Sequence, residues 1–362
     1  MAQSFSKFIT EEVKEQSYKL VVFNNASEQI RDVKDTGLSE LTKLIKKSAK
    51  AVDVEVYLVD FLGCYVSYKN GKTYINSLPL GEDGVKLPDI KGNEIEYQDP
   101  IEIHPETTII MPRGLGTLGM TSSRYWVDMI RRFELEGYIT IPNLHCWDMC
   151  SSKYMTDILM NQHGLKTPKT VAITHSEDTE RAVKELGGKF PIIMKSSIGT
   201  QTGVGVVIVE SLRSLNAMVQ MMLLWEQHIP LILQEYVKID YDIRVVVLDG
   251  NILGAMKRNV IVSDSDFRSN VSLGGEAETI ELTELEIRDS LTAASAVKGR
   301  LVGVDLIPSK DREKEQPLVL EVNSMPGFGG IEKITKDKSI TQEIFRHFKN
   351  RDNWKGNDDD TT

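Results

Sequence analysis

The sequence predicts a mixed fold, in which an α/β domain at the N-terminus is followed by α+β modules. Strand and helix signals alternate over residues 1–149, whereas the later strands come in hairpins with helices clustered between them. A chain of 362 residues also exceeds one typical domain of roughly 150 residues, so two or three domains are expected. Hydrophobic residues make up 41% and charged residues 27%, which is the balance of a globular protein.

The charge and the cysteine content exclude several classes of protein. With 43 basic and 53 acidic residues the formal net charge is −10, and no basic run offsets the repulsion of nucleic acid. The N-terminal sequence lacks the apolar core of a signal peptide, and no apolar stretch approaches the roughly 18 residues of a membrane span. Three cysteines are too few for a disulfide framework. We therefore expect a cytoplasmic protein that contacts neither nucleic acid nor membrane directly.

Residues 1–149 form the predicted N-terminal α/β domain. Strands are expected at residues 19–23, 54–61 and 107–112, with helices at residues 38–52 and 125–135. Asn70 and Gly71 lie between two strand-like runs. Because both residues favour positive φ, they predict a tight hairpin turn.

Residues 150–228 form a predicted central subdomain. Ser151 and Ser152 are good N-caps for a helix that closes near Gly164. Further on, strands are expected at residues 190–195 and 204–210, and a helix at residues 212–226. The segment is therefore expected to be a small α+β module.

Residues 229–350 form the predicted C-terminal subdomain. Strands are expected at residues 231–237, 243–248, 252–256, 301–307 and 318–322. Asp249 and Gly250 predict a hairpin turn, and only a short polar stretch separates the last two strands, so these should pair antiparallel. Residues 351–362 lack apolar periodicity and are expected to be a disordered, solvated tail.

Asp305, Glu321 and Asn323 are the strongest candidates for a metal site. Residues i and i+2 of a strand project from the same face, so Glu321 and Asn323 point together, and an antiparallel partner can bring Asp305 beside them. Two carboxylates and an amide oxygen are hard ligands, suited to Mg²⁺ that bridges a polyphosphate. The alternative is a set of polar residues on a solvated sheet face.

A lysine followed by a glycine-rich loop is the second candidate site. A strand ends at Lys195, and Gly199, Gly203 and Gly205 follow before the next strand. Glycines let backbone N–H groups approach a phosphate, and the lysine supplies a compact positive charge. The loop does not match the Walker pattern, and a strand rather than a helix follows it. The alternative is an ordinary turn.

Other polar residues stand where apolar strands end. The strand at residues 231–237 can offer backbone groups to a purine at its end. Arg244 follows Asp242 by two residues, and Arg268 follows Asp266 in the same way. Arginine is suited to clamping phosphate and carboxylate groups.

Two further patterns carry less weight. Residues 114–119 match G-x-G-x-x-G between a strand and a helix, but two strand signals precede them, whereas a dinucleotide fingerprint normally follows the first strand. A dinucleotide-dependent oxidoreductase is therefore a remote alternative. His145, Cys146 and Cys150 are too few for a zinc site without a second cysteine pair, so buried thiols are expected.

Taken in chain order, these pieces resemble the ATP-grasp ligases, and more narrowly the RimK-type amino-acid ligases of the α-L-glutamate ligase kind. The similarity is dense over about residues 107–333. Its most specific parts are the run DFRSN at residues 266–270, with Gly274 and Gly275 behind it, and the strand end EVNSMPG at residues 321–327. The resemblance implies an ATP-grasp fold preceded by an N-terminal α/β domain.

The resemblance also implies a role for each matching residue. Arg244 and Arg268 would be the catalytic cations, and Asp242 would contact the ribose. Asp305, Glu321 and Asn323 would bind Mg²⁺ or Mn²⁺, as two ions. The residues implied to bind ATP are Lys153, Lys195, Gly199, Thr200, Gln201, Gly203, Gln234, Glu235, Tyr236, Val237, Asp242, Arg268, Ser269 and Asn270.

The activity implied is that of an ATP-dependent carboxylate–amine ligase. ATP converts a carboxylate into an acyl phosphate, and an amine then attacks it to give an amide or peptide bond. The partners implied are an amino acid such as glutamate and a carboxylate on a protein C-terminus or small molecule, and a homo-oligomer is left open. The alternative is a catalytically idle nucleotide-binding module that interacts with proteins, although the three candidate metal ligands favour an enzyme.

Basic residues near the hairpin and the DFRSN run bear on the choice of amino acid. Arg244, Lys257, Arg258 and Arg268 exceed what the ATP phosphates require, which predicts an additional carboxylate and hence an acidic substrate. The alternative is that Lys257 and Arg258 are exposed to solvent. Asn259 stands where glutamate ligases tend to carry arginine, which argues against glutamate itself.

Overall fold

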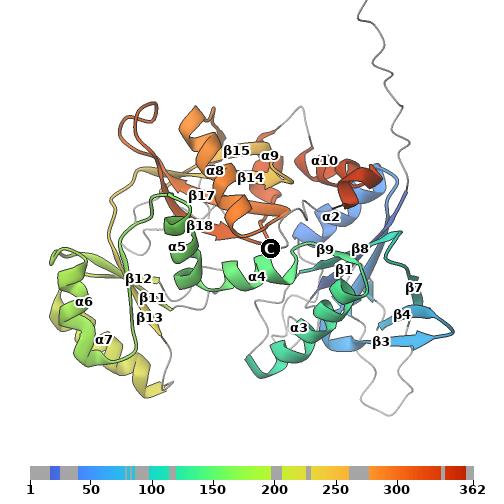
Figure 1. Cartoon of the computed structure of the whole chain (residues 1–362), viewed down its shortest axis with the longest axis horizontal. Helices are drawn as coiled ribbons and strands as arrows, with labels where there is room; N and C mark the ends of the chain where they lie inside the picture. Colours follow the sequence, from blue (N-terminus) through green and yellow to red (C-terminus); the bar gives the residue numbers. More distant parts are fainter. Residues whose placement is uncertain are drawn as a thin grey trace, which may run out of the picture.

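The computed structural model contains three sheet-based units (Figure 1). It describes residues 17–24, 40–77, 80–81, 84–85, 98–113, 120–196, 206–225, 230–260, 277–335 and 339–355. Helices and several sheets alternate within these ranges, so the predicted mixture of α/β and α+β structure is confirmed. Within the described ranges, no helix combines the length and the apolar character that crossing a membrane requires.

The N-terminal domain is built on a four-stranded parallel sheet in the order β2-β1-β8-β9. Its strands are β1 (Lys19–Asn24), β2 (Glu55–Asp60), β8 (Thr108–Pro112) and β9 (Ile139–Thr140). Its helices are α2 (Glu40–Ala51) and α3 (Met120–Leu135). After β1 the chain builds outward to β2, and it then returns to the other side of β1 to form β8 and β9. The strand order therefore reverses between β1 and β8, and in open α/β sheets such a switch point is where ligands bind.

A smaller antiparallel sheet flanks this domain. It consists of β3 (Cys64–Lys69), β4 (Lys72–Ser77) and β7 (Ile101–Ile103), and short elements beside it are η1 (Phe61–Gly63), β5 (Leu80–Gly81) and β6 (Gly84–Val85). Asn70 has φ of 54° and Gly71 has φ of 78°, as a two-residue hairpin turn requires. The predicted hairpin is confirmed.

The central unit is a four-stranded antiparallel sheet with two helices on it. The strand order is β10 (Thr170–Ile173), β13 (Leu231–Glu235), β11 (Ile192–Ser196) and β12 (Val206–Val209). The other elements are η3 (Ser176–Asp178), α6 (Thr179–Glu185) and α7 (Leu212–Trp225). We expected the strand at residues 231–237 to open the C-terminal subdomain, but it pairs with β10 and β11 inside this sheet. The reason is that strand pairing here is non-local, because β13 inserts between two earlier strands.

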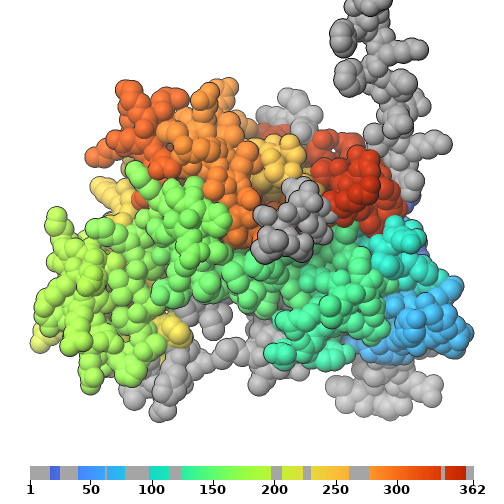
Figure 2. Space-filling model, viewed as in Figure 1, coloured from blue at the N-terminus to red at the C-terminus, as the bar shows by residue number. Residues whose placement is uncertain are grey.

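Two helices connect the units. They are α4 (Leu144–Ser151) and α5 (Lys153–Gln162), with the Ser152 hydroxyl accepting a hydrogen bond from the backbone N–H of Met155 as the predicted N-cap. In Figure 2 these residues form a green band from the central unit toward the N-terminal domain. We expected α5 to belong to the central subdomain, but Met160 packs into the core of the C-terminal sheet instead.

The C-terminal unit is a five-stranded antiparallel sheet in the order β16-β15-β14-β17-β18. Its strands are β14 (Tyr241–Leu248), β15 (Asn251–Asn259), β16 (Ala277–Thr279), β17 (Leu301–Ile307) and β18 (Leu318–Asn323). Its helices are α8 (Glu284–Ala296), α9 (Gly329–Ile334) and α10 (Ile340–His347). Both predicted hairpins are confirmed: Asp249 and Gly250 have positive φ at the β14–β15 turn, and β17 pairs antiparallel with β18.

The N-terminal domain and the C-terminal unit share one hydrophobic core. Leu20 and Val22 of β1 belong to the same buried cluster as Val246 and Leu248 of β14, together with Phe345 of α10. Figure 1 shows α10 lying against α2, next to the edge of the N-terminal sheet. Because interiors of this kind are close-packed, the shared core fixes the two sheets relative to each other.

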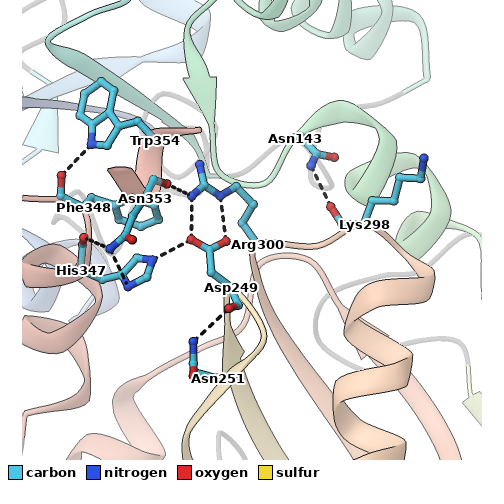
Figure 3. A network of polar contacts seen from close by, with 9 residues as sticks. All are labelled: Asn143, Asp249, Asn251, Lys298, Arg300, His347, Phe348, Asn353 and Trp354. Carbon is cyan, nitrogen blue, oxygen red and sulfur yellow. Dashed lines mark hydrogen bonds and ion pairs between the residues drawn. The ribbon is translucent and has the colours of Figure 1, made fainter. Parts of the chain in front are cut away.

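The chain beyond α10 is packed rather than solvated over its first residues, which corrects part of the predicted tail. Residues Arg351–Trp354 form the 3₁₀ helix η5, and the Trp354 indole donates to the backbone oxygen of Phe348 at 2.6 Å. Figure 3 shows how this segment meets the β14–β15 turn: Arg300 forms a bidentate pair with Asp249 and donates to the backbone oxygen of Asn353. Residues 356–362 of the predicted tail lie outside the described residues.

Candidate active site

The predicted metal-binding side chains are brought together on the last two strands of the C-terminal sheet. Asp305 of β17 lies directly opposite Glu321 of β18, so both side chains project from the same face. The Asn323 amide nitrogen is 3.4 Å from Asp305 Oδ2. The predicted arrangement of two carboxylates and one amide within a small area is therefore present.

Asp305 is held by two arginines, one from the adjacent strand β14 and one from β15 on the other side of β14. Arg244 of β14 donates to both carboxylate oxygens at 2.7 Å, and Arg258 of β15 lies 3.1 Å from Oδ2. Burial alone would raise the pKa of Asp305, but the two guanidinium groups outweigh it and hold the pKa below its ordinary value. Asp305 is therefore an ionised carboxylate although it is only 3% exposed.

Arg258 also forms a bidentate pair with Asp242, at 2.6 and 2.7 Å. Both partners are buried, and β14 and β15 place them directly opposite each other. Although burial lowers the pKa of Arg258, Asp305 and Asp242 raise it above its ordinary value. Asp242, Arg258, Asp305 and Arg244 thus form a continuous row of alternating charges across three strands, which we call the arginine–aspartate row.

The arginine–aspartate row corrects two expectations. Asp242 does not have the accessible carboxylate that a ribose contact needs, because it is 1% exposed and both of its oxygens bind Arg258. Arg244 and Arg258 are not surplus cations either, since aspartates neutralise both. The turn at Asp249 and Gly250 alone does not predict these pairs, because the register of β14 and β15 shifts between Val246 and Val247.

Lys257 is not a surplus cation for a substrate. Its ammonium group is 3.7 Å from a carboxylate oxygen of Glu278 and 4.9 Å from the centre of the Tyr241 ring. Its side chain is partly exposed, as the alternative interpretation of this lysine supposed. Asn259 donates to Glu278 at 3.3 Å, so it also contacts this edge of the sheet.

Two lysines from different units of the fold interact electrostatically with Glu321. Lys153, the first residue of α5, is 3.5 Å from a Glu321 oxygen. Lys195 of β11 donates to the Gln234 side chain at 2.9 Å and is 8% exposed. Burial, followed by repulsion from Lys153, lowers the pKa of Lys195 to about 8, although Glu321 acts in the opposite direction. The predicted phosphate-binding lysines are therefore close to each other and to the carboxylate pair.

The end of β13 holds the other predicted nucleotide contacts that are described. The Gln234 amide is buried, accepts from Lys195 and donates to Thr170 at 2.8 Å. A Glu235 oxygen accepts from the backbone N–H of Lys169 at 2.8 Å. Beyond the strand, Tyr236 is exposed and Val237 partly exposed. The side chains of Gln234 and Glu235 are thus committed to holding Lys195 and the sheet edge.

A glycine lets the loop after β18 approach the arginine–aspartate row. A Cβ atom on Gly303 would lie 3.0 Å from Cβ of Pro326 and 3.8 Å from Nε of Arg244. Since real Cβ atoms rarely approach a neighbour this closely, any other residue at 303 would push Pro326 away. This close approach places the segment Asn323 to Pro326 against the side chains that surround Asp305.

Several predicted site residues lie outside the described residues. They are Gly199, Thr200, Gln201, Gly203, Arg268, Ser269 and Asn270. The dinucleotide-like run at residues 114–119 also lies outside them.

Cys146 and Cys150 are one helical turn apart on α4. No group of three or more His, Cys, Asp or Glu side chains able to hold a metal occurs among the described residues. A hydrogen bond with Cys146, together with burial, raises the pKa of Cys150 well above its ordinary value. Cys150 is therefore a protonated thiol in the absence of a nearby cation.

Sequence reasoning missed Arg113, which follows β8. Its guanidinium nitrogen Nη2 is 3.4 Å from the backbone oxygens of both Met325 and Pro326, in the loop that follows the carboxylate-bearing strand. A single arginine after a buried strand matches no motif. The available signal was its place at the carboxyl end of a central parallel strand, where ligand-binding residues collect.

Comparison with known proteins places this geometry in a family context. The model of the RimK-like ATP-grasp domain matches residues 150–347. A protein from Coxiella burnetii (strain Dugway 5J108-111) named probable alpha-L-glutamate ligase is 30% identical over 297 residues, covering 82% of this chain and 87% of that protein.

Two solved structures of the ATP-grasp ligase PsnB share the fold. The complex with a minimal precursor has a TM-score of 0.62 at 18% identity and covers 92% of this chain and 99% of PsnB. The complex with minimal precursor, Mg and ADP has a TM-score of 0.59 at 17% identity, covering 92% and 98%. At such identities the likeness establishes the fold, so the predicted ATP-grasp architecture is confirmed.

Proposed function

Since this chain belongs to the RimK-like ATP-grasp family, it is an ATP-dependent ligase, and we propose that it joins the amino group of an amino acid to a carboxylate through an acyl phosphate. One observation supports this most strongly. Lys153 and Lys195, from two different units, lie beside the Asp305–Glu321 carboxylate pair. Cations and carboxylates at one place suit a metal-bound triphosphate, which needs both.

ATP and Mg²⁺ are the cofactors of ATP-grasp ligases, and the residues present fit a magnesium ion. The Glu321 side chain is 39% exposed, with Lys153 at 3.5 Å. Asp305 is ionised, and a metal would replace the contact of at least one of its oxygens with Arg244 or Arg258. Asp305, Glu321 and Asn323 would hold the metal, and two ions rather than one is part of the proposal. The bound ion would neutralise the phosphate charge that builds up as the γ-phosphoryl group is transferred.

The lysines would bind the phosphates directly. Lys195 is poised for this role because burial disfavours its charge until an anion arrives, and Gln234 fixes the direction of its ammonium group. The arginine–aspartate row would keep Asp305 ionised and in place. Under this proposal Arg244 acts on the reaction through Asp305, which it holds with two hydrogen bonds.

The substrates are proposed from the relatives and from the chemistry of the reaction. A relative is named as a glutamate ligase, and a structural neighbour was solved with a precursor. We therefore take an amino acid such as glutamate as the amine donor. The acceptor would be a carboxylate on a peptide, on a protein C-terminus or on a small molecule.

The test supplies the purified protein with Mg²⁺, ATP, a pool of amino acids and candidate carboxylate acceptors, and it follows both phosphate release and product mass. The expected result is an acceptor whose mass increases by one or more amino-acid residues, with stoichiometric phosphate. The protein could instead bind Mg-ATP tightly and release no phosphate with any combination of amino acid and acceptor. That result would indicate an idle nucleotide-binding module.

A further inference from the structure

Two polar side chains stand at the switch point of the N-terminal sheet. Asn24 is the last residue of β1, and Arg113 follows the last residue of β8. The two strands are parallel with Phe23 opposite Pro112, and the backbone N–H of Arg113 donates to the Phe23 oxygen at 3.0 Å. Asn24 and Arg113 are therefore neighbours across the sheet edge.

Both side chains belong to the same face of that sheet. Leu20 and Val22 of β1 and Met111 of β8 point into the core shared with the C-terminal unit. Since side chains alternate along a strand, Asn24 and Arg113 continue this face. The shared core thus changes from apolar to polar where the N-terminal strands end.

Arg113 differs from Arg244 and Arg258 because no carboxylate of the described residues forms an ion pair with it. Among the described residues its hydrogen-bond acceptors are the backbone oxygens of Met325 and Pro326, and its guanidinium carbon lies 5.8 Å from the centre of the Phe328 ring. Desolvation by the surrounding protein lowers its pKa to about 10. Burying a cation without an anionic partner costs free energy. An anionic group of a ligand would therefore stabilise Arg113.

Asn24 adds an unsatisfied donor at the same place. Its amide nitrogen is buried and has no hydrogen-bond partner among the described residues. Asp60 ends β2 directly opposite Asn24, and two strand spacings of about 4.8 Å separate its backbone from that of Arg113. A buried amide donor and a guanidinium that binds backbone oxygens are therefore adjacent.

This pair of donors lies one loop away from the carboxylates. Arg113 donates to the backbone oxygen of Pro326, and Pro326 packs against Gly303 on the side where Arg244 also lies. Arg244 in turn holds Asp305. A small molecule bound at Arg113 could therefore extend past this loop toward the phosphate site.

We propose that Arg113, together with the Asn24 amide, binds the carboxylate of the amine-donating amino acid. This inference rests on the ligase function proposed above. In the second half-reaction the amine nitrogen forms a bond to the acyl carbon, the bond from that carbon to the phosphate oxygen breaks, phosphate leaves with the electron pair, and the nitrogen loses a proton to water. Binding the amino acid through its own carboxylate positions its amino group for attack. The same contact prevents that carboxylate from reacting with the γ-phosphate of ATP.

Hydroxylamine separates this role from the activation of the acceptor. It attacks acyl phosphates and carries no carboxylate, so it reports acyl-phosphate formation without using Arg113. In Arg113→Met we expect hydroxamate formation within about twofold of the wild type, whereas kcat/KM for the amino acid falls by about 30-fold or more. Arg113→Lys should recover part of this loss. Arg124→Met removes an exposed arginine of α3 and serves as the matched control.

A second comparison uses the substrate instead of the protein. The wild type should strongly prefer an amino acid over its α-carboxamide, and Arg113→Met should lose most of that preference. Asn24→Asp puts a negative charge beside the proposed carboxylate, so it should raise KM for the amino acid while leaving hydroxamate formation intact. This variant keeps the test open if Arg113→Met does not fold.

The outcomes separate the two proposals. If the wild type forms neither hydroxamate nor ligated product, the ligase proposal fails and this one with it. Unchanged amino-acid kinetics in Arg113→Met would overturn the carboxylate site alone. A parallel loss of hydroxamate and product in folded Arg113→Met and Arg113→Lys, with Mg-ATP binding retained, would overturn it as well, because Arg113 would then serve the acceptor.

Discussion

The C-terminal sheet and the central sheet both contribute charged side chains to the active site, but they differ in whether those charges are paired within the protein. On the C-terminal sheet, Asp242, Arg258, Asp305 and Arg244 neutralise one another within the protein. On the central sheet, Lys195 is buried beside a neutral glutamine and is repelled by Lys153. Charges that are paired directly fix a geometry, whereas Lys195, which Glu321 and Asp157 stabilise only partly, would gain further stabilisation from an anionic ligand.

The largest effect expected from this contrast is on turnover at the carboxylate pair. Asp305→Asn and Glu321→Gln keep the side-chain shapes and remove the charges proposed to hold magnesium. Each should lower kcat by on the order of 10³-fold, measured as phosphate release with saturating ATP. Full activity in both variants would contradict the metal site.

The same two variants should differ in stability, which sharpens the comparison. Asp305→Asn leaves Arg244 and Arg258 without the charge that they share, so the free energy of unfolding should fall by about 3 kcal/mol. Glu321→Gln removes a partly exposed charge and should change it by about 0.5 kcal/mol or less. Denaturant titration of both variants measures the difference. Equal stability losses would show that the row is not a unit.

Lys195→Met should act on ATP binding rather than on the fold. Loss of one charged phosphate contact should weaken Mg-ATP binding by about 10- to 100-fold, as measured by calorimetry. The free energy of unfolding should stay the same or rise near neutral pH, because a desolvated cation is removed. A large loss of stability would indicate that Lys195 is structural.

The lowered pKa of Lys195 gives a pH dependence with a definite sign. In the folded protein burial lowers this pKa to about 8, while an unfolded lysine titrates near about 10.4. Between these values the unfolded chain binds more protons, so the free energy of unfolding should gain from Lys195 as the pH rises. Lys195→Met should lack this gain, which thermal or denaturant unfolding across the window can measure.

Bound Mg-ATP should favour the protonated form of Lys195 and so act against the effect of burial. Phosphate favours the charged lysine, so Mg-ATP binding above about pH 8 should take up a proton and weaken as the pH rises further. Calorimetry in two buffers with different ionisation enthalpies detects the uptake, with Lys195→Met as the control. Proton release in the wild type would contradict this assignment.

The smallest effect is expected at Lys257. Its pairing with Glu278 is partly exposed, so Lys257→Ala should change the free energy of unfolding by no more than about 0.5 kcal/mol. The preference among glutamate, aspartate, lysine and alanine as amine donors should also stay unchanged, as read by product mass. A shift in that preference would restore the idea that this lysine selects an acidic substrate.

The hairpins and the carboxylate pair could be predicted from the sequence, because features close together along the chain determine them. Asn70 with Gly71 and Asp249 with Gly250 carry the backbone preference of their turns within two residues. Asp305 and Glu321 lie on strands joined by one short connection, so their proximity followed from an antiparallel pairing. In each case the deciding interaction is between residues close in sequence.

The expectations that failed depended on sheet order or on an irregular register. The position of β13 between β10 and β11 follows from sheet order, and the pairing of Arg258 with Asp242 includes a register shift between Val246 and Val247 of the β14–β15 hairpin. Arg113 and Asn24 become neighbours only because β1 and β8 are adjacent, with about 90 residues of chain between them. A single sequence shows which side chains of a strand share a face, but it does not show the order of the strands in a sheet.

The connections of the central unit have a mechanical consequence. The chain enters this unit shortly before β10 and leaves it directly after β13, and β10 and β13 are adjacent strands. Two neighbouring tethers on one side of a rigid sheet act as a hinge. The N-terminal domain and the C-terminal unit, by contrast, are joined through their common core. The central unit, which carries Lys195, can therefore turn about these tethers, whereas the shared core fixes Arg113 relative to the loop at Pro326.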